Sequence, residues 1–204
     1  MDNDRLTKRV FLWDRHINKR NWSNDVYHIL SDIGQDLLYA HNDIVNLVSA
    51  KENVFNTYKE QWRAQSVNMP KLRTYVTYKH EYLPEPYVYK VTDRGHRSIL
   101  AQFRCGILPL AIEMGRFNDI PLEYRLCDFC NDDVLEDEIH FLLHCNFYHE
   151  YRAQLMSKVI DHTTDFYFMT IEQKLHTLMG PECVKPTAEY LYKAYYKRKY
   201  SMYN

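Results

Sequence analysis

Glycine is scarce in this sequence, with five residues among 204, and no stretch is of low complexity. Long apolar runs are also missing, because the longest ones, GILPLAI and IHFLL, fall far short of the roughly 20 residues that cross a bilayer. The first residues, MDNDRLTKRVFLWD, carry charges where a secretory signal needs an apolar stretch. These absences argue against a disordered, membrane-spanning or secreted protein. We therefore expect an intracellular protein, in the nucleus or cytoplasm, with no membrane partner.

Neither sign of charge is in excess, since the formal net charge is −1, so composition gives no general argument for a nucleic-acid partner. The distribution along the chain is uneven. No Lys or Arg lies between Leu126 and Tyr151, a segment that holds seven acidic residues: Asp128, Asp132, Asp133, Glu136, Asp137, Glu138 and Glu150. Arginines gather just upstream of this acidic segment: Arg94, Arg97, Arg104, Arg116 and Arg125.

The pattern of apolar residues predicts a mostly α-helical fold. Residues 22–34 show helical spacing, and we expect Ser23 to cap this helix and Gly34 to end it. A second helix follows Asn42, with a candidate core face of Ile44, Val45, Leu47, Val48, Phe55, Tyr58 and Trp62. Thr170 and Gln173 form a capping-box pattern before a further helix.

One segment departs from the helical pattern. Residues 69–91, MPKLRTYVTYKHEYLPEPYVYKV, contain inner prolines and many Tyr and Val, which favours an extended segment with a short hairpin or helical turn. The predicted organisation is an N-terminal helical region (1–68), a connector with this extended stretch and an Arg-bearing helix (69–125), and a metal knuckle with C-terminal helices (126–204). These regions could also pack as a single domain.

The segment CDFCNDDVLEDEIHFLLHC, residues 127–145, has the spacing of a metal site. Cys127 and Cys130 form a C-x2-C pair, followed by His140 and Cys145 in the pattern C-x2-C-x9-H-x4-C. Intracellular cysteines stay reduced, and clustered ones more often bind metal than form disulfides. Three thiolates and one imidazole suit tetrahedral Zn²⁺. The sequence therefore predicts a zinc knuckle.

The ligand set is open at one point. His144 lies one helical turn after His140, so it could replace either His140 or Cys145 as a ligand. The preference of zinc for thiolate favours Cys145 as the fourth ligand. Four protein ligands leave zinc no open position, which predicts a structural site and not a catalytic one.

Enzymatic chemistry has little support elsewhere in the sequence. Asp132 and Asp133 resemble a polymerase aspartate pair, but the residues before them do not fit that site. Asp161, His162 and Asp165 match no nuclease spacing, and no glycine-rich phosphate loop is present. We therefore predict a protein that is not an enzyme.

Several segments together carry a family resemblance: PKLRTYVTYKHEYLPEPYV, RSILAQFRCGILPLAIEMGRF, YRLCDFCNDDVLEDEIHFLLHCNFYHEYR and the opening VFLWDRHINKRNWSNDV. They resemble the carboxy-terminal tail of reverse transcriptases from animal non-LTR retrotransposons, most specifically from Arg97 to Arg152. The resemblance implies the four zinc ligands named above and a role in holding template RNA or target DNA near a polymerase. The palm and endonuclease of that family have no counterpart, and a Met opens the chain just ahead of the tail. We expect a truncated or domesticated remnant.

The leading functional hypothesis is a non-catalytic, zinc-stabilised accessory module that binds RNA or DNA, with a polymerase or another protein as a further partner. The acidic knuckle would repel phosphate, so we expect the contacts from the upstream segment with Arg94, Arg97, Arg104 and Arg116, or from the basic terminal helices. The C-terminal helix carries Lys193, Lys197, Arg198 and Lys199. The alternative is a structural zinc domain that binds a protein through the acidic knuckle. A continuous basic face would favour the first hypothesis, and arginines paired with acids would favour the second.

Overall fold

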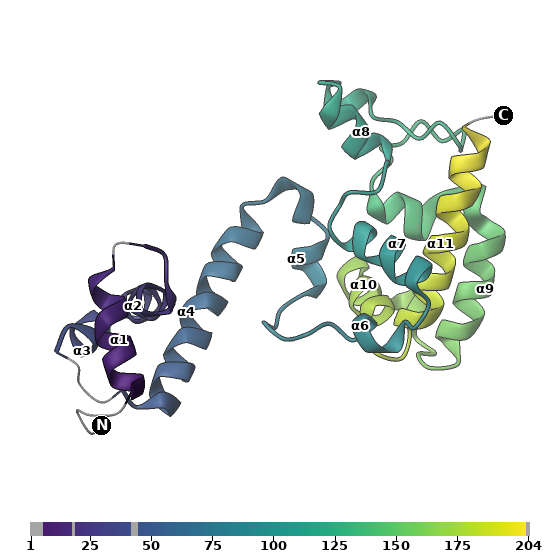
Figure 1. Ribbon diagram of the computed structural model, residues 1–204. Coiled ribbons are helices and arrows are strands. Elements are labelled where there is room, and N and C mark those ends of the chain that lie inside the picture. The colour runs from purple at the N-terminus through teal and green to yellow at the C-terminus, as the bar shows by residue number, and fades with distance from the viewer. Residues whose placement is uncertain (1–5, 18, 42–44, 203–204) are drawn as a thin grey trace. The chain divides into compact units, whose positions relative to one another are not determined.

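The computed structural model describes residues 6–17, 19–41 and 45–202, and the chain divides into two compact units, 1–65 and 66–204 (Figure 1). The fold is mostly α-helical, as the sequence predicts, and the described residues contain one isolated β-bridge and no longer strand. None of the helices among them is long and apolar enough to cross a membrane. The expected connector, 69–125, belongs to the same unit as the expected metal segment.

The first unit contains α1 (Leu6–His16), α2 (Trp22–Asp32), α3 (Asp36–His41) and most of α4 (Leu47–Val67). Asn21 caps α2 in place of the predicted Ser23, because its Oδ1 accepts the N–H of Asn24 at 3.0 Å. The Ser23 hydroxyl instead shares a hydrogen bond with the hydroxyl of Tyr39 at 2.5 Å. Gly34 follows the end of α2 as predicted, at a φ of 68° that glycine adopts without steric cost.

Helix α4 forms where the apolar spacing predicts a helix, and Asn46 Oδ1 accepts the N–H of Val48 at its start. The predicted core face is wrong at this end, because Leu47 and Val48 are each 69% exposed. Phe55, farther along the same face, is also exposed, and Ile44 lies outside the described residues. Apolar spacing identified the helix, but it did not identify which residues are covered.

The second unit contains η1 (Pro70–Leu72), α5 (Tyr75–Tyr78), α6 (Tyr87–Lys90), α7 (Arg94–Arg104), α8 (Ala111–Phe117), η2 (Leu122–Tyr124), η3 (His140–His144), η4 (Asn146–Tyr148), α9 (His149–Ile160), η5 (Phe166–Phe168), α10 (Ile171–Met179) and α11 (Val184–Ser201). Helix α11 packs against both α7 and α9 (Figure 1). Its Ala188 and Ala194 are fully buried, and these small side chains let the neighbouring helices approach closely. The capping box of Thr170 and Gln173 is present at the start of α10, as predicted.

The segment 69–91 forms short helical turns where the sequence favours an extended stretch. Its prolines start these turns, because Pro70 is the first residue of η1 and Pro86 directly precedes α6. The fixed φ of proline suits the first residues of a helical turn as well as it suits a strand edge. Only the part between α5 and α6 has no helix. The sequence allowed a helical turn in this segment, and the structure has three, which leaves residues 79–86 as the longest stretch without a helix.

Candidate metal centre

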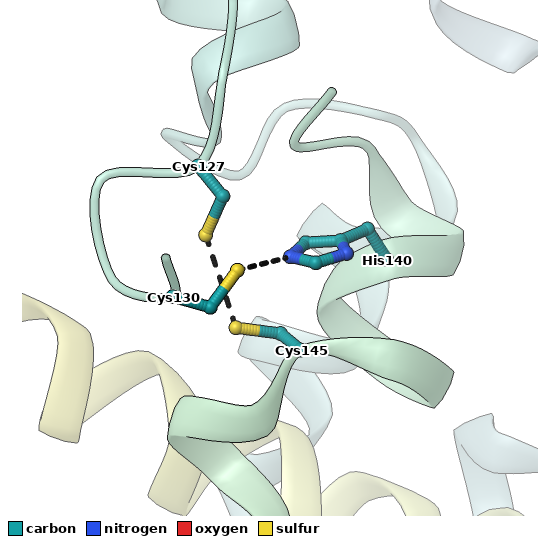
Figure 2. Close-up of side chains that lie close together, drawn as sticks. All are labelled: Cys127, Cys130, His140 and Cys145. Carbon is teal, nitrogen blue, oxygen red and sulfur yellow. Dashed lines mark hydrogen bonds between the residues drawn. The ribbon is translucent and has the colours of Figure 1, made fainter. Parts of the chain in front are cut away.

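A loop closed by the isolated β-bridge carries the first two cysteines. Leu126 and Leu135 form the antiparallel bridge, and the N–H of Cys127 donates to the carbonyl of Val134 at 2.9 Å. The chain reverses between them through Asp133, which has a φ of 48°. This closed loop carries Cys127 and Cys130, whose side chains lie close to those of His140 and Cys145 (Figure 2).

A π-helical turn, His140–His144, presents the other two residues. The N–H of Cys145 donates to the carbonyl of His140 at 2.7 Å, five residues back, and Asp137 Oδ1 accepts the N–H of His140 at 2.7 Å. A π-turn is wider than an α-turn, so it brings residue i+5 back over residue i. Cys145 therefore joins His140 at the cluster, while His144 is exposed to solvent.

The four predicted ligands meet at one point. Their ligand atoms, three sulfurs and one imidazole nitrogen, all lie within 4.8 Å of one another (Figure 2). The sulfurs of Cys127 and Cys145 are 3.8 Å apart, and Cys130 Sγ lies 3.3 Å from His140 Nε2. A disulfide would need about 2.05 Å between sulfurs, so these are separate thiols. The cluster could hold a metal ion, and it contains His140 and Cys145 but not His144.

Backbone N–H groups point at the sulfurs, as expected for thiolate ligands. Those of Phe129 and Cys130 face Cys127 Sγ, and that of Phe147 faces Cys145 Sγ. Without a metal, a hydrogen bond to Cys145 and burial raise the pKa of Cys127, and the same hydrogen bond lowers the pKa of Cys145. Burial raises the pKa of Cys130 to about 11 and lowers that of His140. The imidazole is therefore neutral at pH 7, which is the form that binds metal.

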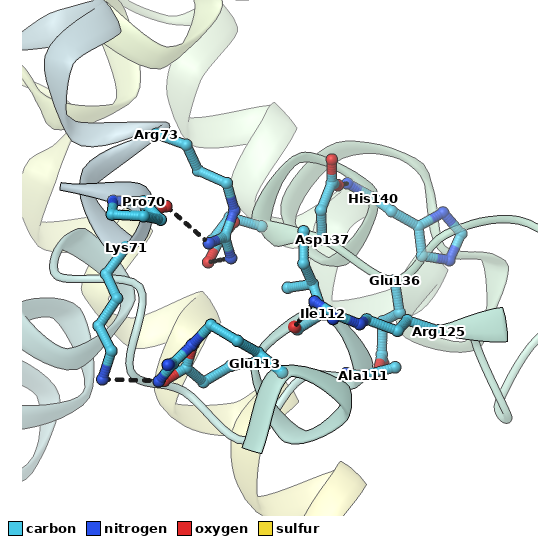
Figure 3. Close-up of polar contacts among 12 residues, drawn as sticks. Pro70, Lys71, Arg73, Ala111, Ile112, Glu113, Arg125, Glu136, Asp137 and His140 are labelled. Atoms are coloured by element: carbon cyan, nitrogen blue, oxygen red, sulfur yellow. Dashed lines mark hydrogen bonds and ion pairs between the residues drawn. The ribbon is translucent and has the colours of Figure 1, made fainter. Parts of the chain in front are cut away.

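A buried ion pair lies next to the metal cluster. The carboxylate of Glu136 contacts Arg198 Nη1, from α11, and the two side chains are 1% and 5% exposed. The same carboxylate accepts the N–H of Ala111 at 2.7 Å, at the start of α8 (Figure 3). It also lies 3.8 Å from Cys127 Sγ. Arg198 Nη2 also donates to the carbonyl of Pro109 at 3.0 Å. Glu136 thus connects the metal cluster to two helices that are distant in sequence.

Hydrogen bonds from two further side chains stabilise the π-turn. Arg152, from α9, donates to the carbonyls of Leu142 and Cys145 at 3.0 and 2.5 Å. Tyr190, from α11, donates to the carbonyl of Phe141 at 2.8 Å. These carbonyls are at the end of a helical turn, where they have no partner within the turn. Both long helices of the unit therefore hold the segment that carries His140 and Cys145.

The acidic segment is only partly a surface. Glu136 forms a buried ion pair with Arg198, and Asp137 caps the π-turn. Glu138, whose side chain is 1% exposed, forms an ion pair with Arg73 at 2.6 Å. The acids of the segment that are exposed are Asp128, Asp132, Asp133 and Glu150. A partner that docks on the knuckle would thus meet four carboxylates and not seven.

The four arginines predicted to contact phosphate do not share one environment. Arg94 is exposed at the start of α7, and Arg97 is half-buried, with Nη1 donating to the carbonyl of Val91 at 3.0 Å. Arg116 pairs with Glu113, which Lys71 also contacts at 2.9 Å (Figure 3). These contacts, that of Arg116 above all, lower the pKa of Glu113 to about 2.

Arg104 is buried, which removes it from the predicted interface. It is 2% exposed and lies 2.6 Å from Glu85, with its guanidinium within 5.8 Å of the rings of Tyr75, Tyr78 and Tyr87. The rings of these three tyrosines cover the guanidinium of this arginine. Arg97 and Arg104, two helical turns apart, therefore do not form one basic face.

Sequence reasoning missed the residues that support the cluster. The role of Arg198 depends on a contact across 62 residues, and that of Arg152 on the backbone of a π-turn, so neither has a local signal in the sequence. Glu136 and Glu138 could have been suspected, because each stands next to an apolar residue, Leu135 or Ile139, that is partly buried.

Comparison of the chain with protein-family models, with curated proteins and with solved structures found no match.

Proposed function

We propose that the cluster binds one Zn²⁺ as a structural site. Two thiolates at about 2.3 Å from a tetrahedral zinc ion lie about 3.8 Å apart, and a thiolate and an imidazole about 3.6 Å apart. The distances of 3.8 and 3.3 Å between the paired ligand atoms support this geometry. Zinc would join the loop of Cys127 and Cys130 to the π-turn. Because all four positions are taken by the protein, no water or substrate has a place on the metal.

Zinc content and melting test this site directly. Protein purified without chelator should contain one zinc ion per chain, and Cys130→Ala should lose it. Structural zinc contributes on the order of 10 kcal/mol in small zinc modules, so chelation should unfold the metal segment and destabilise the second unit. Cys105→Ala is the matched control, because Cys105 is an exposed cysteine outside the cluster. Metal-free protein whose melting is unchanged by chelation would exclude the site.

We propose further that the second unit binds single-stranded nucleic acid along a row of aromatic rings. The rings of His96, Tyr192, Tyr196 and Tyr200 follow one another with centroid separations of 4.7, 4.6 and 6.0 Å. Lys199 Nζ lies 5.9 Å from the centre of the Tyr196 ring. Rings beside cations are the elements that bind single strands without sequence preference. We call these four rings the tyrosine row.

Two observations support this placement. Besides the buried Arg198, residues 190–201 of α11 contain three lysines, Lys193, Lys197 and Lys199, and no acid, which suits a phosphate backbone. The resemblance to reverse-transcriptase tails also favours a nucleic-acid partner. In this proposal the tyrosine row takes the place of the four arginines, of which Arg104 is buried, Arg97 is half-buried and Arg116 is paired with Glu113.

The alternative is a zinc domain that binds a basic protein partner through the knuckle. The pairing of arginines with acids, as in Arg73–Glu138 and Arg116–Glu113, favours it. The exposed carboxylates of Asp128, Asp132 and Asp133 would then form the contact.

Salt-dependent binding to single-stranded RNA and DNA separates the two proposals. Tyr200, at the end of the row, is 63% exposed, so Tyr200→Ala should keep the fold. Loss of one stacked base costs about 1–3 kcal/mol, which is roughly 5- to 150-fold in affinity. Lys199→Ala should flatten the slope of log affinity against log salt by about 0.7. Tyr167→Ala is the matched control, because Tyr167 is 60% exposed on η5, outside the row.

Neutralising acidic residues of the knuckle tests the alternative in the same binding experiment. The pair Asp132→Asn and Asp133→Asn should leave nucleic-acid affinity equal or slightly higher, because it removes negative charge. If the wild-type chain shows no salt-dependent affinity for any single strand, and the knuckle variant loses a basic protein partner, the second proposal replaces the first.

A further inference from the structure

A cavity of about 450 Å³ lies in the second unit, away from the metal cluster. One wall is the segment between α5 and α6, and the opposite wall is the end of α10, at Met179 to Pro181. Leu83, Pro84 and Met179 give these walls an apolar surface. The volume falls within the range of about 300–1,000 Å³ in which proteins bind small molecules.

The cavity has a polar end formed by Arg104 and Tyr78. Arg104 Nη2 lies 2.6 Å from Glu85, but Nη1 is buried without a hydrogen-bond partner. The hydroxyl of Tyr78, a residue 6% exposed, is also buried without a partner. Burying such groups unpaired costs about 1–3 kcal/mol each, so native proteins rarely leave them unpaired. Two unused donors at the end of an open cavity indicate a ligand that accepts hydrogen bonds.

The charges around the cavity favour an anion. Lys79 and Arg104 share one carboxylate, that of Glu85, which Lys79 Nζ contacts at 3.0 Å. Two cations and one acid leave an excess of one positive charge at this end. Burial raises the pKa of Tyr78, so its hydroxyl keeps its proton and donates. At the rim lie Glu81, His80 and His176, all exposed to solvent, where water screens their charges.

We propose that this cavity binds a small organic carboxylate with an apolar body, whose oxygens accept hydrogen bonds from Arg104 Nη1 and the Tyr78 hydroxyl. A carboxylate accepts two donors at once, and guanidinium is the cation that best matches its geometry. The apolar body lies against Leu83, Pro84 and Met179. The carboxylate can belong to a free small molecule or to the C-terminal residue of a peptide, since both present the same group.

Binding of matched carboxylates and amides tests the proposal on the zinc-loaded, full-length chain. The probes are hexanoate, with hexanamide as its neutral counterpart, and N-acetyl-leucine, with N-acetyl-leucinamide. We expect dissociation constants of about 1 mM for the carboxylates, from NMR titration, because each has few atoms. Each amide should bind at least about tenfold more weakly, because it lacks the charge. Preference for hexanoate would indicate a free acid, and preference for N-acetyl-leucine a peptide terminus.

Tyr78→Phe is the decisive variant, because it removes one unpaired hydroxyl and nothing that holds the fold. Its melting temperature should equal or exceed that of the wild type, while carboxylate affinity falls about 10- to 100-fold. Tyr87→Phe is the control, because Tyr87 also faces the Arg104 guanidinium but is not part of the cavity wall. It should leave affinity unchanged. The proposal is overturned if no carboxylate binds, if amides bind equally well, or if Tyr78→Phe has no effect on affinity.

Discussion

Replacing Arg198 with methionine removes the cation that compensates the buried carboxylate of Glu136. With side chains only 1% and 5% exposed, neither group can exchange its partner for water. Removing one member of a buried ion pair costs about 3–5 kcal/mol, because the other charge stays buried. A domain of this size has about 5–15 kcal/mol of stability in total. Arg198→Met should therefore remove a large part of the free energy of unfolding of the second unit.

The same change should weaken zinc binding. The carboxylate of Glu136 lies 3.8 Å from Cys127 Sγ. Burial raises the pKa of this carboxyl, and Arg198 offsets part of the rise. Once Cys127 is a thiolate, it and the carboxylate of Glu136 repel each other, and Arg198 offsets this repulsion. Residues that support metal ligands in this way are typically worth 10- to 100-fold in metal affinity. We expect a loss in that range.

A surface ion pair of the same unit provides the control. Lys158 contacts Glu189 at 2.7 Å, but their side chains are 54% and 28% exposed. Such a pair contributes about 0–1 kcal/mol, so Lys158→Met should change little. The measurement is guanidinium unfolding of zinc-loaded protein by near-ultraviolet circular dichroism, with chelator competition for zinc affinity. Glu136→Gln with Arg198→Met should recover part of the loss. The reasoning fails if Arg198→Met costs no more than Lys158→Met.

Four other substitutions, at three positions of the second unit, are tested by the same unfolding measurement. Gly106→Ala should lower the free energy of unfolding by at least about 2 kcal/mol, because Gly106 has a φ of 60° and an added Cβ would lie 2.1 Å from the carbonyl oxygen of Lys71. An unchanged unfolding midpoint would contradict this. Asp133 has a φ of 48°, in the left-handed region that glycine adopts without strain and valine does not. Asp133→Gly should therefore be neutral or stabilising by up to about 1 kcal/mol, and Asp133→Val destabilising by about 1–2 kcal/mol. Equal stability of the two variants would argue against a left-handed backbone conformation at this position. Tyr190→Phe should cost about 1–3 kcal/mol by leaving the carbonyl of Phe141 unpaired, and no loss would mean that water replaces the hydroxyl.

The cluster of three cysteines and one histidine could be predicted from the sequence because its four residues are close together in the chain. All four come from residues 127–145, and the C-x2-C spacing fixes the geometry of the first two. The supporting residues could not be predicted in this way. Arg198 meets Glu136 across 62 residues, and which of several arginines does so depends on how α11 packs.

Arg104 shows a different limit of sequence reasoning. A basic residue on an amphipathic helix is normally placed on the surface, and the sequence placed this one beside Arg97 on a phosphate-binding face. Three tyrosines and Glu85 from the preceding 30 residues cover it instead. Their prolines fold that segment into short turns instead of a strand, and this arrangement brings the rings over the guanidinium. Charge patterning alone contains no information on such coverage.

The choice between His140 and His144 tests the π-turn itself. In a regular α-helix the two imidazoles would lie on one face, four residues apart, and either could bind the ion. The hydrogen bond from the N–H of Cys145 to the carbonyl of His140, across five residues, widens the turn and leaves His144 exposed. His140→Ala should therefore abolish stoichiometric zinc binding, whereas His144→Ala should keep one zinc ion per chain with affinity within about threefold, since a surface substitution changes stability by about 0.5 kcal/mol or less. Elemental analysis after dialysis against a weak chelator measures both. Retention of zinc by His140→Ala together with loss by His144→Ala would mean that the segment is an α-helix in the zinc-bound protein, because only that geometry turns His144 toward the sulfurs.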